Sequence, residues 1–273
     1  MRKYTMHDTV QLALLIRQTC LTLCHTKNAS HLGGAFSVAD IMAVLYGHSL
    51  EHNPQQPRMP ERDRLFYSKG HACTALYSAL AHSGYFPVEQ LLNEFTENGS
   101  FFTSHVNHHV PGVELSTGSL GHALGVAAGV TLAGERRHKD YRVYAILSDG
   151  ELDEGSNWEA ILFAGHHHLS RLTMVIDYNK IQSFGHVEDV LGLEPLADKL
   201  TAFGWAVAEV DGHDHEALKT VFSMATSQPL AVIAHTVKGK GVSFMENQLA
   251  WHYKSPKHDE YALALAELGG AQP

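Results

Sequence analysis

Short apolar runs alternate with longer segments of helical periodicity from residue 143 onward, and few folds accommodate such an alternation. The apolar runs cover residues 143–147, 173–176, 206–210 and 230–234. The segments of helical periodicity cover residues 151–166, 195–203 and 216–227. Because consecutive parallel strands need a long and usually helical crossover, this order predicts an α/β fold in which helices flank both faces of a parallel sheet.

The first half of the chain predicts further helices and one more strand. Helices are expected at residues 10–27, 38–46, 72–81 and 120–134, with another at residues 259–268, and a strand is expected at residues 65–67. Residues 99–119 show little periodicity, and an irregular segment of that length in a compact domain is usually functional. Since no repeat, low-complexity tract or linker divides the sequence, we expect residues 1–273 to form a single domain.

Charge and cysteine content argue against several classes of protein. The formal net charge of -9 gives no electrostatic reason to expect a nucleic acid or an anionic membrane as a partner. Cys20, Cys24 and Cys73 are too few and too scattered for a disulfide framework, which indicates buried free thiols. The N-terminal segment lacks the features of a secretory signal, and no apolar run is long enough to span a bilayer. We therefore expect a cytoplasmic protein.

Two polar residues, Asp149 and Asn179, closely follow predicted strands. Ligands of open α/β sheets collect at the carboxyl ends of the strands. Mg²⁺ commonly takes one or two protein oxygens together with phosphate oxygens, and Gly150 would let a backbone N–H approach an anion closely. The pair therefore suggests a site for a divalent cation and a diphosphate. Taken alone, a helix cap at Asp149 and a turn at Asn179 explain the two residues at least as well.

Other phosphate and metal sites find less support. No G-x-G-x-x-G motif opens a helix after a strand, and residues 150–156 have the form G-x-x-x-x-G-S without the lysine of a P-loop. Among the 21 histidines, two groups have loosely metal-like spacing, namely His166 to His168 and the set His105, His108 and His109. The first group ends a predicted helix, where imidazoles meet free carbonyl groups, and the second lacks cysteines, so neither favours zinc.

Several motifs in a fixed order carry a family resemblance. They are Ser30-His31-Leu32-Gly33-Gly34, Ser68-Lys69-Gly70-His71, Gly112-Val113-Glu114, Thr117-Gly118-Ser119-Leu120-Gly121, Asp149-Gly150 followed by Asn179, and Asp211-Gly212-His213. In this order they resemble the motifs of transketolases, and the resemblance extends from the first helix to about Pro256. It implies a thiamine diphosphate-binding fold. It also implies an enzyme that transfers a two-carbon ketol unit from a ketose donor, expected to be phosphorylated, to an aldose acceptor.

The resemblance implies a set of contacts to thiamine diphosphate. Asp149, Asn179 and the backbone carbonyl of Ile181 would bind Mg²⁺, which bridges the diphosphate. The remaining implied contacts are Gly150, His71 and His252 at the diphosphate, Gly118 at the aminopyrimidine and Leu120 at the thiazolium.

The resemblance further implies catalytic roles for four histidines and a glutamate. His31, His105 and His252 match histidines that line the donor-sugar channel, while Glu154 matches a glutamate that links cofactor sites across a dimer. Because imidazoles titrate near neutral pH, they can bind sugar hydroxyls and move protons. We therefore expect His31, His71, His105, His252 and Glu154 to take part in catalysis.

The sequence departs from the family pattern at three points. Ser148 stands where the motif usually begins with glycine, and His105 lies in Ser104-His105-Val106 where the family usually has G-H-P. We expect the small serine to be tolerated. The third departure is that full transketolases carry a pyrimidine-binding domain with a glutamate that activates the cofactor, and no residue here matches that glutamate.

This last departure predicts the N-terminal subunit of a split transketolase. We expect it to act on sugars with a separate C-terminal subunit, as a heterotetramer with two copies of each chain. One alternative is a subunit of another thiamine diphosphate enzyme, similar to deoxyxylulose phosphate synthase or to a 2-oxo acid dehydrogenase. A second alternative is a noncatalytic assembly subunit. The set of histidines disfavours the first alternative, and the intact Asp149 and Asn179 disfavour the second.

Overall fold

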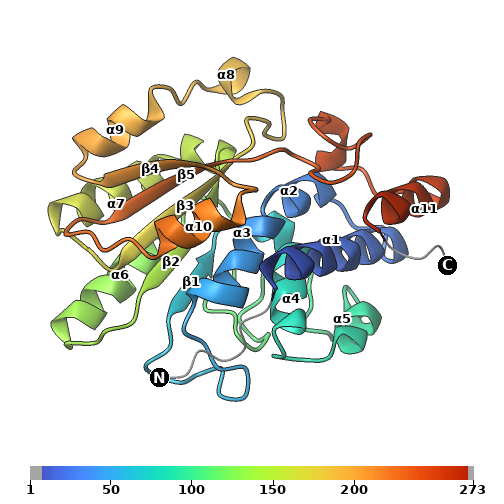
Figure 1. Ribbon diagram of the computed structural model, residues 1–273, viewed down its shortest axis with the longest axis horizontal. Coiled ribbons are helices and arrows are strands. Elements are labelled where there is room, and N and C mark those ends of the chain that lie inside the picture. The colour runs from blue at the N-terminus through green and yellow to red at the C-terminus, as the bar shows by residue number, and fades with distance from the viewer. Residues whose placement is uncertain (1–7, 270–273) are drawn as a thin grey trace.

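The computed structural model describes residues 8–269, and its centre is a five-stranded sheet in the order β1-β2-β3-β5-β4 (Figure 1). Every neighbouring pair of strands in this sheet is parallel. The strands are β1 (Arg64–Tyr67), β2 (Val143–Ser148), β3 (Leu172–Tyr178), β4 (Ala206–Asp211) and β5 (Leu230–His235). Each lies where the sequence predicted a strand, which confirms the parallel α/β fold.

Every predicted helix has a counterpart in the structure, but the bounds differ and three short helices were not predicted. Those with a predicted counterpart are α1 (Thr9–Thr26), α3 (Ala39–Val44), α4 (Cys73–His82), α6 (Ala123–Arg136), α7 (Gly155–His166), α9 (Leu196–Ala202), α10 (His215–Phe222) and α11 (His258–Glu267). The sequence missed three short ones, α2 (Leu32–Ser37), α5 (Val88–Glu94) and α8 (Val187–Val190). A π-helical turn (Leu45–Ser49) follows α3 directly, and 3₁₀ turns form at three places (Gly70–Ala72, Gly150–Asp153 and Leu249–His252). The predicted helix at 151–166 is therefore a 3₁₀ turn followed by α7.

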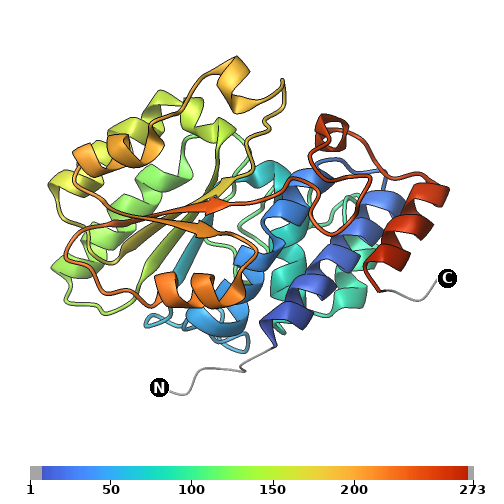
Figure 2. The ribbon, with the colours of Figure 1, turned by 45° about the horizontal axis from the view of Figure 1, so that its top comes forward.

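Helices cover both faces of the sheet, and each face has its own apolar core. Ile146 and Val175 pack in the core formed with α1, α3, α4 and α10, whereas their chain neighbours Leu147 and Ile176 pack in the core formed with α6, α7 and α9. Figure 2 shows α6, α7 and α9 on one side of the sheet and α10 on the other. Helix α11 packs beside α1, away from the sheet. With both faces buried, polar residues gather where the strands end.

The five strands end at one edge of the sheet, because all of them are parallel. The segments that follow them contain Lys69 after β1, Asp149 after β2, Asn179 after β3, His213 after β4 and Lys238 after β5. This edge therefore brings together residues that lie far apart in the sequence.

Two further predictions concern residues away from this edge. Cys20, Cys24 and Cys73 are buried and free, which confirms the prediction of buried thiols. Among residues 8–269, no helix has both the length and the apolar character needed to cross a membrane.

Candidate functional site

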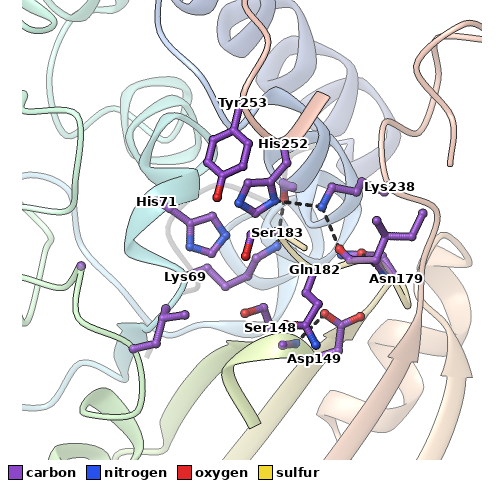
Figure 3. A pocket seen from close by; sticks show the side chains of 15 residues that line it. Lys69, His71, Ser148, Asp149, Asn179, Gln182, Ser183, Lys238, His252 and Tyr253 are labelled. Carbon is purple, nitrogen blue, oxygen red and sulfur yellow. Dashed lines mark hydrogen bonds between the residues drawn. The ribbon is translucent and has the colours of Figure 1, made fainter. Parts of the chain in front are cut away.

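A pocket of about 200 Å³ lies at the carboxyl edge of the sheet (Figure 3). The residues that line it come from all parts of the chain, and they are Gly34, Lys69, His71, Gly118, Leu120, Ser148, Asp149, Gly150, Asn179, Ile181, Gln182, Ser183, Lys238, His252 and Tyr253. All eight residues predicted to contact thiamine diphosphate are among them. Figure 3 shows Asp149 at one end of the pocket and His71, His252 and Tyr253 at the other.

Asp149 and Asn179 occupy the buried end of this pocket, and both make local hydrogen bonds. The Asp149 carboxylate accepts from the Gly150 N–H at 2.7 Å and from the Lys180 N–H at 2.5 Å. Asn179 Oδ1 accepts from the Ile181 N–H at 3.2 Å. Burial, followed by the nearby Asp177 carboxylate, raises the pKa of Asp149 to about 6. The predicted cap and turn roles are thus both present, and the same two side chains also line the pocket.

Two buried lysines, Lys69 and Lys238, give the pocket positive charge. Lys69 Nζ donates to the Gly34 carbonyl at 2.9 Å and pairs with Asp177, which is itself fully buried. Lys238 Nζ donates to the Ile181 carbonyl at 2.7 Å and to His252 Nδ1 at 3.0 Å. Burial lowers the pKa of Lys238 to about 8, so most of its ammonium stays charged at neutral pH.

Neither lysine was among the predicted contacts, although the rule that identified Asp149 and Asn179 applies to both. Lys69 follows β1 and Lys238 follows β5, so each stands shortly after the carboxyl end of a parallel strand. Gly33 of α2 leaves room for the Lys238 side chain, since a Cβ there would lie 3.1 Å from Lys238 Cγ.

Three of the predicted histidines form a cluster next to the lysines. The ring centroid of His31 lies 5.3 Å from that of His71 and 5.1 Å from that of His252. Burial is the main cause that lowers the pKa of His31 to about 4 and of His252 to about 3, and Lys238 acts in the same direction. Burial and Lys69 likewise hold the pKa of His71 well below its ordinary value. The cluster therefore consists of neutral imidazoles, and an anion bound beside them would raise their pKa values.

His31, His105 and Glu154 are not among the residues that line this pocket, but His31 and His105 line a neighbouring pocket that shares His71 with it. The exposed His105 ring has its centroid 6.3 Å from that of His31, and it contacts Gly118, where an added Cβ would lie 3.2 Å from the ring. Glu154 is exposed at the start of α7, beside the turn at Gly121. The structure thus places His105 next to the histidine cluster and leaves Glu154 accessible to another chain.

Glu151 is a fully buried acid that the sequence did not single out. Its carboxylate accepts from the Ser68 hydroxyl, from the Gly121 N–H at 2.9 Å and from the Ser148 N–H at 3.4 Å. Burial raises its pKa. The Glu151 side chain therefore links the segment after β1, the end of β2 and the loop that carries Gly118, and these three segments all contribute residues to the pocket.

The turn after β1 contacts the Gly118 loop so closely that Gly70 tolerates no side chain. A Cβ on Gly70 would lie 2.4 Å from the Thr117 carbonyl oxygen. We expect Gly70→Ala to lower the free energy of unfolding by about 1–3 kcal/mol, as overpacking usually does. Gly155→Ala is the control, since a Cβ there meets no atom within 4 Å. Equal denaturation midpoints for the two variants in urea would show that the close contact is absent.

Apart from His105, the histidines of the two groups with metal-like spacing lie away from the pocket. His166 ends α7, and His167 and His168 follow it on the exposed surface. His108 and His109 are also exposed, and they hydrogen-bond to Ser116 and Asn107. Within the described part of the chain, no three His, Cys, Asp or Glu side chains gather in a cluster suited to a metal ion.

The donor groups of the pocket fit a hard cation and a diphosphate. The Asp149 carboxylate, the Asn179 amide oxygen and the Ile181 carbonyl are oxygen ligands of the kind that Mg²⁺ prefers. Lys69 and Lys238 add two buried ammonium groups that can pair with phosphate oxygens. Gly150 lets the turn after β2 pack closely against Gln182, since a Cβ there would lie 2.7 Å from Gln182 Cβ.

Comparison with known proteins shows the family to which the chain is similar. Residues 9–272 match the family described as the transketolase, thiamine diphosphate binding domain. A 6-deoxy-6-sulfo-D-fructose transketolase subunit of a Clostridium species is 39% identical over 265 residues, which cover 96% of each chain. An apulose-4-phosphate transketolase subunit of Actinobacillus succinogenes is 40% identical, with 94% of each chain covered. A solved transketolase from Campylobacter jejuni superposes with a TM-score of 0.92 at 30% identity, covering 97% of this chain but 43% of that one.

Proposed function

Because the chain belongs to the transketolase family and matches two relatives named as transketolase subunits over 94–96% of their length, we propose that it is the N-terminal subunit of a two-chain transketolase. The proposed reaction moves a two-carbon ketol unit from a ketose to an aldose with thiamine diphosphate and Mg²⁺. The observation that carries the proposal is the single pocket in which all eight predicted cofactor contacts meet two buried lysines. The family match favours this reaction over that of a synthase-like or dehydrogenase-like enzyme and over a noncatalytic role.

The proposed cofactor site divides the residues by charge. Asp149, Asn179 and the Ile181 carbonyl hold Mg²⁺, and Lys69 and Lys238 neutralise the remaining charge of the diphosphate. The backbone at Gly150 and the side chains of His71 and His252 contact the same group. Gly118 and Leu120, which also line the pocket, hold the two rings of the cofactor.

Bound thiamine diphosphate would supply the chemistry that breaks and forms the carbon–carbon bond. The chain would then bind and orient the sugar. His31, His105 and His252 would hydrogen-bond to hydroxyl groups, and neutral imidazoles suit this task because each can donate through one nitrogen and accept through the other. Lys238 donates to His252 Nδ1, so the ring proton of His252 is on Nε2, where it can donate to an oxygen.

The rest of the enzyme is proposed to come from a C-terminal subunit with the activating glutamate, in a heterotetramer with two copies of each chain. The relatives from Clostridium and Actinobacillus are named as subunits, which supports this assignment. Their substrates, as named, carry a sulfonate or a phosphate. We accordingly propose a sugar with a terminal anion as substrate. The exposed Glu154 would link cofactor sites across the assembly, which is proposed to be cytoplasmic in keeping with the three free thiols.

Mixing the two subunits tests the proposal. The partner would be sought in the neighbouring reading frame, and ketol transfer would be measured with each chain alone and with both. Activity is expected in the mixture and not in either chain alone, and calorimetry should show thiamine diphosphate binding that requires Mg²⁺. Full activity of this chain by itself would refute the two-chain enzyme. A mixture that binds no thiamine diphosphate would refute the assigned cofactor.

A further inference from the structure

The Asp211-Gly212-His213 motif has no role in the proposed cofactor contacts. It forms the turn between β4 and α10, where the Asp211 carboxylate accepts from the His213 N–H at 2.8 Å. The Gly212 N–H donates to the His235 carbonyl at 2.8 Å, and a Cβ on Gly212 would lie 2.4 Å from Thr236 Cγ2. The turn is therefore held tightly against the end of β5.

The His213 ring bridges two segments from this turn. Its Nδ1 lies 2.6 Å from Asp40 Oδ2, and its Nε2 accepts from the Val237 N–H at 2.9 Å. Because Nε2 is an acceptor, the ring proton must be on Nδ1, which donates to Asp40. The hydrogen bonds thus fix a neutral ring in one tautomer.

Asp40 is a firm anchor for the ring. It lies on α3, is buried, and also binds Arg17 of α1 at 2.5 Å and His215 Nε2 at 3.0 Å. Burial would raise the pKa of Asp40, but the hydrogen bonds from His213 and His215 and the nearby Arg17 hold it well below its ordinary value. His213 therefore ties the end of β5 to an ionised carboxylate in the helical layer.

Val237 immediately precedes Lys238, so its N–H fixes the point where the chain turns into the pocket. On the C-terminal side, the Asn247 N–H donates to the Lys238 carbonyl at 2.8 Å and the Gly239 N–H donates to the Gly33 carbonyl at 3.0 Å. On the N-terminal side, the Thr236 N–H donates to the Tyr178 carbonyl at 3.2 Å. The hydrogen bond from the Val237 N–H to His213 is the anchor next to Lys238 itself.

We propose that His213 is a positioning residue for Lys238, and that it acts by holding the Val237 N–H so that the Lys238 ammonium stands between Ile181 and His252 in the pocket. The inference rests on the proposed function, because it assigns to Lys238 a contact with the diphosphate. His213 itself touches neither the pocket nor the reacting groups.

A matched pair of variants separates positioning from folding. His213→Ala and His215→Ala each remove one hydrogen bond to Asp40, but only the first leaves the Val237 N–H without its acceptor. The affinity for thiamine diphosphate with Mg²⁺ would be measured by calorimetry on the chain mixed with its partner. We expect about a tenfold loss for His213→Ala and less than about a twofold loss for His215→Ala, since one buried donor is left unpaired in the first variant. His213→Gln should restore most of the affinity, because its amide oxygen can accept from Val237.

A double-variant cycle with Lys238→Met tests whether His213 acts through Lys238. If it does, Lys238→Met should weaken binding much less in the His213→Ala background than in the wild type. The inference would be overturned if Lys238→Met caused the same fold-loss of affinity in both backgrounds, or if His213→Ala and His215→Ala lost equal affinity. Either result would leave His213 with a purely structural role. A wild-type mixture that binds no thiamine diphosphate would overturn the proposed function and, with it, the inference.

Discussion

Asp149→Asn is expected to abolish metal-dependent binding of thiamine diphosphate while leaving the protein folded. The variant keeps the shape of the side chain but replaces the carboxylate proposed to hold Mg²⁺. The expected loss of affinity is more than about 100-fold, because even residues that only support metal ligands often contribute 10- to 100-fold. Calorimetry with thiamine diphosphate at saturating Mg²⁺ measures it.

Although Asp149→Asn should lose affinity for the cofactor, the variant without metal should be more stable than the wild type at pH 7.5. Burial and Asp177 raise the pKa of Asp149 from 3.8 to about 6. A raised pKa means that Asp149 contributes stability below about pH 4, and that this contribution is lost as the pH rises through about 6. Since Asn carries no charge, the variant should gain up to about 2–3 kcal/mol at pH 7.5 in the absence of metal, less about 1 kcal/mol for a lost acceptor. Urea denaturation with a chelator, at pH 4.5 and pH 7.5, measures the difference.

Asp153→Asn is the control for both measurements. Asp153 ends the 3₁₀ turn that Asp149 caps and accepts from Gln182 Nε2 at 3.1 Å, but it does not line the pocket. The affinity of the Asp153→Asn variant for thiamine diphosphate should stay close to that of the wild type. Wild-type affinity in Asp149→Asn would refute the metal assignment, and a variant that is less stable at pH 7.5 would show that the carboxylate is not disfavoured by burial.

The sequence predicts the sheet well because the strands are simple to recognise. β2, β3 and β5 are short apolar runs whose residues are almost all buried and alternate between the two cores, and β4 at the edge of the sheet is an apolar run although it is partly exposed. The buried helices are harder. All residues of α2, which the sequence missed, are buried, so its sequence shows no polar face and no clear helical period. In α5 only Leu91 is buried, which leaves too little periodicity to detect.

The same reasoning explains which pocket residues the sequence identifies. Six of the eight predicted contacts stand in the motifs that resemble a known family, Ile181 and His252 follow from the same resemblance, and the structure brings all eight to one pocket. Lys69 and Lys238 were missed because lysine is rarely buried, and the sequence does not show what would balance its charge. The balance comes from long-range contacts, such as that between Lys69 on the β1 turn and Asp177 on β3. Their roles toward the cofactor are predictions that the variants can test.

Asp177→Ala is expected to destabilise the protein by about 3–5 kcal/mol, because it leaves the buried Lys69 ammonium without its counter-charge. The pair is almost completely shielded from water, with 1% of the Lys69 side chain and 0% of the Asp177 side chain exposed. The Ser37 and Thr236 hydroxyls, which donate to Asp177, would also lose their acceptor. Urea denaturation of the purified chain measures the loss.

The exposed pair of Arg171 and Asp140 provides the matched control, since the two side chains are 39% and 94% exposed. Asp140→Ala should lower the free energy of unfolding by less than about 1 kcal/mol, as for most surface ion pairs. If Asp177→Ala were no more harmful than Asp140→Ala, the buried pair would have no special role in stability.

The double variant Lys69→Met with Asp177→Asn separates stability from binding. It removes both charges and keeps an amide oxygen as acceptor for one of the two hydroxyls, while the amide NH2 can donate to the other, so its stability should return to within about 2 kcal/mol of the wild type. Its affinity for thiamine diphosphate with Mg²⁺ should still be at least about tenfold weaker, because the pocket has lost one of the two ammonium groups proposed to face the diphosphate. A stable double variant that binds as tightly as the wild type would show that Lys69 balances Asp177 and makes no contribution to the cofactor site.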